Sequence, residues 1–302
     1  MSETAPPPVI PPEGGIVIVD KDAGWTSHDV VARARKLLQT KKVGHSGTLD
    51  PDATGVLVLG VGRATRLLTF LTGLPKSYVG EVQLGTTTST LDAAGDVTGT
   101  FDMAGVTLAE VEEAASRFRG DIEQIPPMVS ALKVGGKRLH ELAREGKTVE
   151  RKPRPVTISR LDVAPLTTAE GDVESLAFQV TVDCTSGTYI RTLAADIGEA
   201  LGGGAHLRSL RRTAVGSFGL DQANPLEAMV VLPAAEGVRS MGLTEVHEDL
   251  EVSIGHGKVL ARDLLGVVGD GPWPIVNNAG RLLAVYQAHR DGTAKPALVL
   301  AG

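Results

Sequence analysis

The spacing of apolar residues constrains the fold of this chain most. Residues 15–20 read as a buried strand, and an amphipathic helix follows, capped by Ser27, with its arginines on the face opposite the apolar stripe. Further strands are predicted near residues 56–59, 77–84, 156–163, 177–184 and 210–215, and further helices near residues 63–71, 107–118 and 190–201. Because the two types of element do not repeat as regular βαβ units, the sequence favours the α+β class over doubly wound α/β.

The C-terminal part of the chain has a different composition. From Leu232 onward it is Gly-rich, acidic and strand-like, with short apolar runs at residues 267–268, 282–286 and 297–300. A length of 302 residues suggests about two domains. We therefore predict a disordered tail over residues 1–13, a main domain over residues 14–231 and a small β-rich domain over residues 232–302.

Composition excludes several classes of protein. The single cysteine, Cys184, rules out an internal disulfide framework and a zinc site built from several thiolates, and it fits a reducing compartment. No apolar run reaches the roughly 18 residues that a membrane-spanning helix needs. Residues 1–15 are Pro-rich and lack the basic start and apolar middle of a signal peptide. We expect a cytoplasmic protein without a membrane partner.

Charge is sorted along the chain although the net charge is −6. Residues 79–116 hold seven acids and no base, whereas residues 133–160 hold nine bases and three acids. Two more basic groups, at residues 33–42 and 208–212, would extend the second segment into a phosphate-facing stripe. Each cluster alone is better explained as solvated surface. The ten aromatic residues are too few for a broad base-stacking platform, so RNA recognition would rest on shape and backbone contacts.

Two nucleotide-binding signatures are incomplete. The strand before Gly60 and Gly62 resembles a dinucleotide fingerprint, but Thr65 stands where close helix packing needs a third glycine. Residues 146–148 resemble the end of a phosphate loop, yet Glu141 occupies the position of its opening glycine and would turn a carboxylate toward the phosphates. Neither site is expected.

Residues 44–51 form a loop suited to presenting a carboxylate. Two glycines permit a tight path, His45 and Asp50 supply an imidazole and a carboxylate, and Pro51 biases Asp50 toward an extended conformation. Asp50 and Asp52 also have the spacing of enzymes that form an aspartyl-phosphate, but those enzymes place the first Asp at the end of an apolar strand. A magnesium-dependent aspartyl phosphotransferase remains an alternative.

Further segments accompany this loop at residues 20–27, 75–78, 84–92, 126–133, 186–191 and 205–212. Together, over about residues 14–226, they resemble the bacterial tRNA pseudouridine-55 synthases of the TruB family. The resemblance implies a pseudouridine synthase fold, with a mixed, mainly antiparallel central sheet flanked by helices. It makes the main domain catalytic and the C-terminal region a PUA-like RNA-binding module.

The resemblance also implies a reaction. One uridine of the tRNA T-loop is isomerised to pseudouridine, and since no atom is added or removed, no cofactor or metal is required. Asp50 corresponds to the family's nucleophilic carboxylate, which attacks the sugar C1′ or assists departure there. Arg191 corresponds to the cation that keeps this carboxylate ionised. Tyr78 corresponds to the aromatic residue that stacks on the target base, and its hydroxyl is a candidate for removing the C5 proton.

Five more residues correspond to contacts with the RNA or the target base. His45 would enter the T-loop in place of the flipped nucleotide, and Lys21 would contact phosphates. Tyr189 and Leu210 would line the base pocket, and Asp92 is a retained substrate-binding position. The implied partner is the T-arm stem-loop of tRNA, bound by a monomer.

A non-catalytic RNA-binding or tRNA-folding protein on the same scaffold is the alternative that the basic stripe alone permits. Asp50 distinguishes the two, because only the enzyme requires it.

Overall fold

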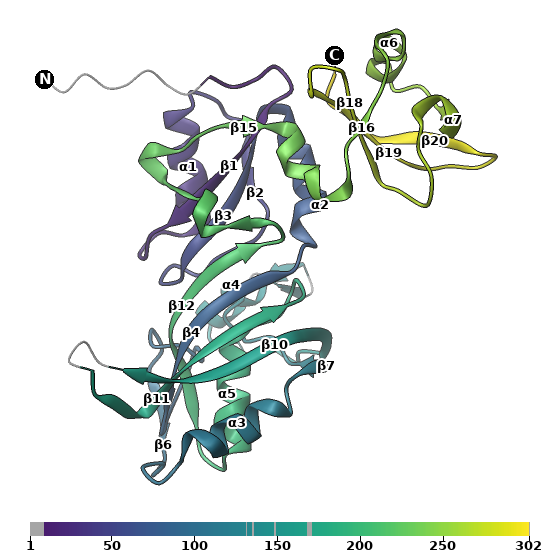
Figure 1. Ribbon diagram of the computed structural model, residues 1–302. Helices are drawn as coiled ribbons and strands as arrows, with labels where there is room; N and C mark the ends of the chain where they lie inside the picture. Colours follow the sequence, from purple (N-terminus) through teal and green to yellow (C-terminus); the bar gives the residue numbers. More distant parts are fainter. Residues whose placement is uncertain (1–8, 131, 135, 148, 168–170, 302) are drawn as a thin grey trace, which may run out of the picture. The chain divides into compact units, whose positions relative to one another are not determined.

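The computed structural model describes residues 9–130, 132–134, 136–147, 149–167 and 171–301, and the chain divides into two compact units (Figure 1). Unit 1 comprises residues 1–51, 56–73 and 217–302, and unit 2 comprises residues 52–55 and 74–216. The predicted domain boundary after residue 231 follows composition rather than this division, and it stays a prediction. In the described part of the chain, no helix has both the length and the apolar character needed to cross a bilayer.

The predicted disordered tail is described only in part. Residues 1–8 lie outside the described residues. Nearer the first strand, Gly14 N–H donates to Pro11 O at 2.8 Å, and Glu13 is buried.

The first part of unit 1 is a mixed sheet around β1 (Gly15–Lys21), whose apolar residues are almost all buried, as expected for a central strand. β14 (Asn224–Pro225) pairs with β1 in parallel, and β15 (Leu232–Pro233) pairs with it antiparallel. β3 (Thr54–Val61) is the other neighbour of β1 and pairs antiparallel with β2 (Val43–His45). The accompanying short elements are η1 (Gly62–Leu67), α2 (Leu68–Thr72), β13 (Phe218–Gly219), η2 (Leu220–Gln222), η3 (Leu226–Ala228) and η4 (Ala234–Met241).

The start of α1 (Ser27–Leu37) corrects a sequence prediction, because Thr26 rather than Ser27 caps the helix. Thr26 Oγ1 accepts from Asp29 N–H at 3.1 Å, and the Asp29 carboxylate accepts from Thr26 N–H at 3.0 Å. Both hydroxyl residues suit an N-cap, and the carboxylate three residues after Thr26 decides between them by completing a capping box.

The second part of unit 1 is a five-stranded sheet near the C-terminus. Its order is β16 (Thr244–Glu245), β18 (Trp273–Val276), β19 (Leu282–Ala288), β20 (Thr293–Val299) and β17 (Leu260–Ala261). The short helices η5 (Glu248–Leu250), α6 (Glu251–Gly255) and α7 (Arg262–Leu265) accompany it. The apolar runs at residues 282–286 and 297–300 lie largely in β19 and β20, as predicted. Residues 267–268 form no strand; Val267 packs in the core of this sheet and Val268 is exposed.

Unit 2 is built on an antiparallel sheet in the order β12 (Ala205–Val215), β4 (Lys76–Leu84), β11 (Val173–Cys184), β10 (Arg154–Thr167) and β7 (Gly120–Gln124). Helices α3 (Leu108–Ser116) and α5 (Ile190–Ala200) cover one face of this sheet (Figure 1). The remaining elements are β5 (Thr86–Thr88), β6 (Val97–Thr100), β8 (Lys133–Val134), β9 (Lys137–Arg138) and α4 (Leu139–Arg144). With parallel and antiparallel pairs both present, the predicted α+β class with a mixed, mainly antiparallel sheet is confirmed.

Strand β4 separates the two faces of the unit 2 sheet. Lys76, Tyr78 and every second residue after them are buried, whereas Val79 and Glu81 are only half-buried. Successive side chains of a strand point to opposite faces. Tyr78 therefore faces the helix-covered side, and Val79 faces the other side.

The beginning of β3 joins this sheet through a glycine. Gly55 pairs in parallel with Arg212 and has φ +100°. A Cβ at Gly55 would lie 2.1 Å from the Arg212 carbonyl oxygen, so the close approach of the two backbones requires glycine here.

Candidate active site

The loop that carries Asp50 joins β2 to β3 in unit 1. Its first arm continues the strand pairing, with His45 opposite Leu59 and Ser46 N–H donating to Val58 O at 3.0 Å. Asp50 is half-buried. Asp50 is therefore not sealed in the core.

The residue before Asp50 is tied to α1. Leu49 N–H donates to Ser27 Oγ at 2.8 Å, and Ser27 Oγ–H donates back to Leu49 O at 3.1 Å. Both residues are buried. This reciprocal pair explains why a serine stands at the first position of the helix although it does not cap it.

The residue after Asp50 is tied to Lys21. The Lys21 ammonium donates to the carbonyls of Asp22 at 2.9 Å, Trp25 at 2.7 Å and Pro51 at 2.9 Å, and the side chain is 1% exposed. The phosphate contact predicted for Lys21 is not tested by these bonds and stays a prediction. Because the buried Lys21 ammonium donates to three backbone carbonyls, it fixes the backbone on the C-terminal side of Asp50.

His45 lies half-buried on β2, where its ring meets that of His28 edge to face, with centroids 5.4 Å apart and an interplanar angle of 77°. Its predicted insertion into an RNA loop is not tested by this arrangement and stays a prediction.

In unit 2, Arg191 is the second residue of α5 and is held by three acceptors. Its Nη1 donates to Thr90 O at 3.0 Å and to Asp92 Oδ2 at 3.1 Å, and its Nη2 donates to Val129 O at 2.7 Å. The side chain is 7% exposed, so its direction is set by these bonds. Arginine suits this position because its planar fork keeps its charge and offers several donors at once.

Asp92, predicted as a substrate-binding residue, is thus the ion-pair partner of Arg191 within unit 2. Its other carboxylate oxygen accepts from Thr90 Oγ1 and from Ala94 N–H at 3.2 Å. These bonds orient the carboxylate that orients the guanidinium. The sequence offered no signal for this pairing, because the two residues lie in distant segments.

Tyr78 lies on the helix-covered face of β4, 8% exposed, directly opposite Arg212 on β12. The Arg212 guanidinium hydrogen-bonds the Tyr78 hydroxyl, and burial lowers the pKa of Arg212 below its usual range. Lys76 shares this face, and burial, with a further contribution from the charge of Arg212, lowers its pKa to about 8. Sequence analysis missed both cations as neighbours of Tyr78.

Leu210 and Tyr189, both predicted to line the base pocket, also belong to unit 2. Leu210 is opposite Gly80 in the β12–β4 register, and a Cβ at Gly80 would lie 3.4 Å from Leu210 Cδ1. The Leu210 side chain therefore lies on the same face as Tyr78. Tyr189 precedes α5, and its backbone N–H donates to Gln124 Oε1 at 2.9 Å. The structure brings Arg191 together with Asp92, and Leu210 onto the face of Tyr78, while Asp50, His45 and Lys21 belong to unit 1.

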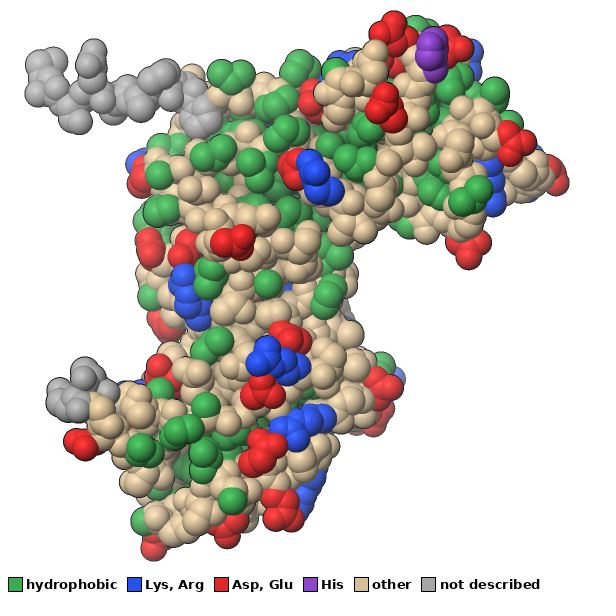
Figure 2. All heavy atoms as spheres, in the orientation of Figure 1, with side chains coloured by type: hydrophobic (Ala, Val, Ile, Leu, Met, Phe, Trp, Pro, Cys, Tyr) green, Lys and Arg blue, Asp and Glu red, His purple; other side chains and the backbone are tan. Residues whose placement is uncertain are grey.

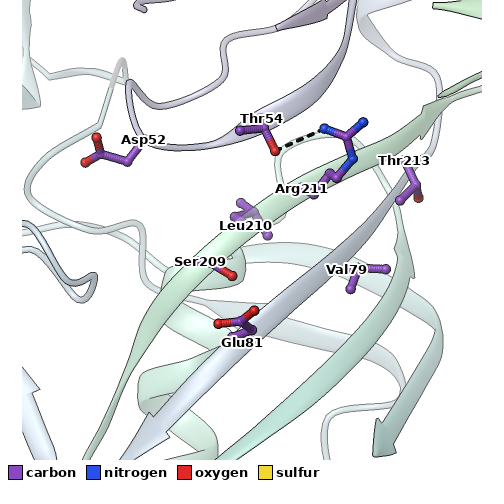
Figure 3. Close-up of a pocket in the computed structure, with 8 residues that line it drawn as sticks. All are labelled: Asp52, Thr54, Val79, Glu81, Ser209, Leu210, Arg211 and Thr213. Carbon is purple, nitrogen blue, oxygen red and sulfur yellow. Dashed lines mark hydrogen bonds between the residues drawn. The ribbon is translucent and has the colours of Figure 1, made fainter. Parts of the chain in front are cut away.

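A hollow of about 390 Å³ lies on the other face of the unit 2 sheet. Figure 3 shows its lining, which consists of Asp52, Thr54, Val79, Glu81, Ser209, Leu210, Arg211 and Thr213. Arg211 donates to Thr54 Oγ1 at 3.3 Å across it. Val79 and Glu81 point away from the face of Tyr78, so the hollow lies on the opposite face of β4, and Leu210, whose side chain lies on the face of Tyr78, also borders it.

Several arginines of the predicted basic stripe are paired with acids or buried. Arg33 pairs with Glu227 at 2.7 Å, Arg208 pairs with Glu174 at 2.6 Å, and Arg212 is 1% exposed. On the face shown in Figure 2, basic and acidic side chains are interspersed rather than gathered by sign. Among the described residues, no group of three or more His, Cys, Asp or Glu side chains is arranged to hold a metal ion.

Comparison with models of protein families shows which family the chain belongs to. Residues 35–190 match the family model described as "TruB family pseudouridylate synthase (N terminal domain)". The chain belongs to the TruB family. Residues 191–241 match a second model, "tRNA pseudouridylate synthase B C-terminal domain". The resemblance predicted from the sequence is confirmed, and the chain is a pseudouridine synthase, an isomerase.

Similar proteins extend the TruB match over nearly the whole chain. The tRNA pseudouridine synthase B of Arthrobacter sp. (strain FB24) is 46% identical over 297 residues, covering 95% of this chain and 96% of that protein. The tRNA pseudouridine synthase B of Mycobacterium tuberculosis (strain ATCC 25618 / H37Rv) is 43% identical over 291 residues, covering 94% of this chain and 95% of that protein.

A solved structure entitled "Crystal Structure of a Cbf5-Nop10-Gar1 Complex" contains a chain that aligns with a TM-score of 0.69 at 25% identity, covering 99% of this chain and 91% of that one. The pseudouridine synthase fold predicted for this TruB member is thereby confirmed.

Proposed function

We propose that this enzyme isomerises uridine 55 in the T-loop of tRNA to pseudouridine, with Asp50 as its nucleophile. The observation that carries the proposal is the Asp50 loop. Asp50 is half-buried, and the residues on both sides of it are fixed by Ser27 and by Lys21. Such anchoring suits a carboxylate that must meet one sugar carbon in a defined geometry. The choice of tRNA rests on the relatives named above.

In this proposal the target base is first extracted from its stack, at a cost of a few kcal/mol. His45 fills the space that the base leaves. Asp50 attacks the ribose C1′ or assists departure there, and the bond from C1′ to N1 breaks with its electron pair passing to the uracil. The uracil turns, C5 bonds to C1′ as the Asp50 carboxylate leaves that carbon, C5 loses its proton, and N1 gains one.

Arg191 and Tyr78 serve the same reaction. Arg191 supplies the positive charge that keeps the Asp50 carboxylate ionised. Its own orientation is supported by Asp92. Tyr78 stacks on the base and accepts the C5 proton in the last step, and Leu210 and Tyr189 complete the apolar lining.

The partner in this proposal is the T-arm stem-loop of tRNA. The enzyme works as a cytoplasmic monomer, and the isomerisation draws on no cofactor and no metal.

The test uses tRNA transcripts tritiated at uridine C5. The enzyme is expected to release tritium from a transcript carrying U55 and not from one in which residue 55 is cytidine. Asp50→Asn is expected to abolish release while tRNA affinity stays near wild type, whereas Asp52→Asn, the matched control two residues away, retains activity. A fully active Asp50→Asn variant would exclude the proposed nucleophile and favour a non-catalytic role for this loop.

The same assay addresses the phosphotransferase alternative. Turnover that persists in excess chelator excludes a magnesium-dependent reaction through Asp50 and Asp52. Loss of turnover under those conditions, restored by magnesium, would contradict the proposal.

A further inference from the structure

The buried side of β4 holds two cations close to the phenol of Tyr78. Arg212 is 1% exposed and opposite Tyr78 in the strand register. Lys76, two residues before Tyr78 and therefore on the same face, is 6% exposed and donates to Leu74 O at 2.7 Å. Burying cationic groups is costly, so their presence beside one hydroxyl calls for a reason beyond packing.

The hydrogen bond from Arg212 to Tyr78 has a defined direction. A guanidinium has five N–H donors and no acceptor, so the Tyr78 oxygen must accept. The phenolic hydrogen is then directed away from Arg212. Once that hydrogen is lost, the phenolate keeps a charge-assisted bond in a place from which water is largely excluded.

The other groups facing this side do not cancel the two cations. In the described strands, the titratable or charged side chains on this face are Lys76 on β4, Arg212 on β12 and Cys184 on β11, and helix α5, which covers the face, carries Arg191 and Asp196. Burial raises the pKa of the Cys184 thiol to about 11, so this group is neutral at working pH. Arg191 is paired with Asp92. Arg212, which stays charged and hydrogen-bonds the Tyr78 hydroxyl, is therefore the cation that favours the ionised form of Tyr78.

We propose that Arg212 is a positioning residue for Tyr78, whose guanidinium orients the hydroxyl and stabilises the phenolate that accepts the C5 proton. The inference rests on the proposed function, in which Tyr78 is the general base of the last step. In that step the C5–H bond breaks, its electron pair restores the C5–C6 double bond of the uracil, and the proton ends on the Tyr78 oxygen. Arg212 itself touches no reacting atom.

The first experiment needs no substrate. The chain contains three tyrosines, so a titration followed by the ultraviolet absorbance of tyrosinate shows at most three ionisation steps as pH rises. The Tyr78→Phe variant identifies the Tyr78 step by its absence, and burial raises the pKa of Tyr286. In Arg212→Met the Tyr78 step is expected to move up by at least about one pH unit, because a neighbouring cation shifts such a group by about that much or more. Arg211→Met, which alters the neighbouring arginine on the opposite face, is expected to leave the step in place.

The second experiment measures tritium release in a single turnover at saturating tRNA. Arg212→Met is expected to slow release on the order of 10²-fold, the lower range for a general base, with partial recovery at higher pH and unchanged tRNA affinity. A purely structural role would lower the rate equally at every pH.

Arg212→Gln provides the second variant if the methionine variant does not fold, as judged by circular dichroism. It keeps a donor without the charge, and the same upward shift is expected. A folded variant of either kind in which Tyr78 ionises at the wild-type pH would overturn the inference. Failure of the wild-type enzyme to release tritium would instead refute the proposed function, while the titration would still report on Arg212.

Discussion

Replacing Lys21 with methionine separates two roles that its charge suggests. Lys21→Met keeps the aliphatic stem and removes an ammonium that makes three bonds of 2.7–2.9 Å to backbone carbonyls. Bonds to a charged donor contribute about 1.5–3 kcal/mol each, and desolvation of the buried ammonium offsets part of that. Since one carbonyl belongs to Pro51 in an exposed turn that can reach water after relaxation, we expect a net loss of about 3 kcal/mol of unfolding free energy.

The same substitution loosens the backbone next to Asp50. A misplacement of about 1 Å in a catalytic group costs on the order of 10²-fold in rate. We therefore expect Lys21→Met to slow tritium release at saturating tRNA by about that factor. The affinity for tRNA and its dependence on salt should stay at the wild-type values, because a buried ammonium releases no counterions when RNA binds.

The assays are denaturant unfolding, single-turnover release, and tRNA binding at several salt concentrations. Lys36→Met, which alters an exposed lysine of α1, is the control for stability and is expected to change it by less than about 0.5 kcal/mol. A phosphate contact by Lys21 would give the opposite pattern. Wild-type stability and rate, together with a salt dependence reduced by about one ion, would refute the anchoring role.

Two further substitutions test stability alone. Ser27→Ala removes two buried hydrogen bonds to Leu49 and is expected to cost about 2 kcal/mol in denaturant unfolding; an unchanged midpoint would contradict the reciprocal pairing. Burial, with a further contribution from Glu199, raises the pKa of Asp196 from 3.8 to about 6, so the folded state binds this proton more tightly than the unfolded state and stability falls as pH rises between those values. Asp196→Asn is therefore expected to stabilise the protein by about 1 kcal/mol at neutral pH, after allowance for the partly exposed carboxyl. Below pH 3.8 the substitution is expected to have no effect on stability. Equal effects at neutral pH and below pH 3.8 would refute this reasoning.

The secondary structure was predictable where one local pattern dominates. Strand β4 alternates buried and half-buried residues along its whole length, and α3 begins at Thr107 with the capping box that the sequence contains. The cap of α1 was predicted wrongly as Ser27, because Thr26 and Ser27 are both good caps. The long-range bond from Ser27 to Leu49 accounts for the serine, and no local rule contains that information.

The family resemblance supplied a set of candidate site residues, whose roles stay predictions, but it did not supply the partners of those residues. Arg191 and Asp92 were assigned separately, yet they form an ion pair at 3.1 Å. Lys21 was assigned to phosphate through the same resemblance, and that contact stays a prediction. The three bonds from its ammonium to backbone carbonyls depend on burial, which the sequence does not state.

The cluster at residues 208–212 explains why charge density along a sequence is a poor guide to an RNA-binding surface. In a strand, neighbouring residues point to opposite faces, so Arg211 turns toward Thr54 while Arg212 turns toward Tyr78. Arg208 is meanwhile paired with Glu174. One basic cluster is thus divided among a hollow, a buried phenol and a surface ion pair, and two of its three members lie on opposite sides of the sheet. A chain with net charge −6 that acts on RNA then has to recognise its substrate largely through shape and a few placed contacts. If the proposed roles hold, substitution of Arg212 or Arg191 is expected to change the rate of the reaction more than the affinity for tRNA.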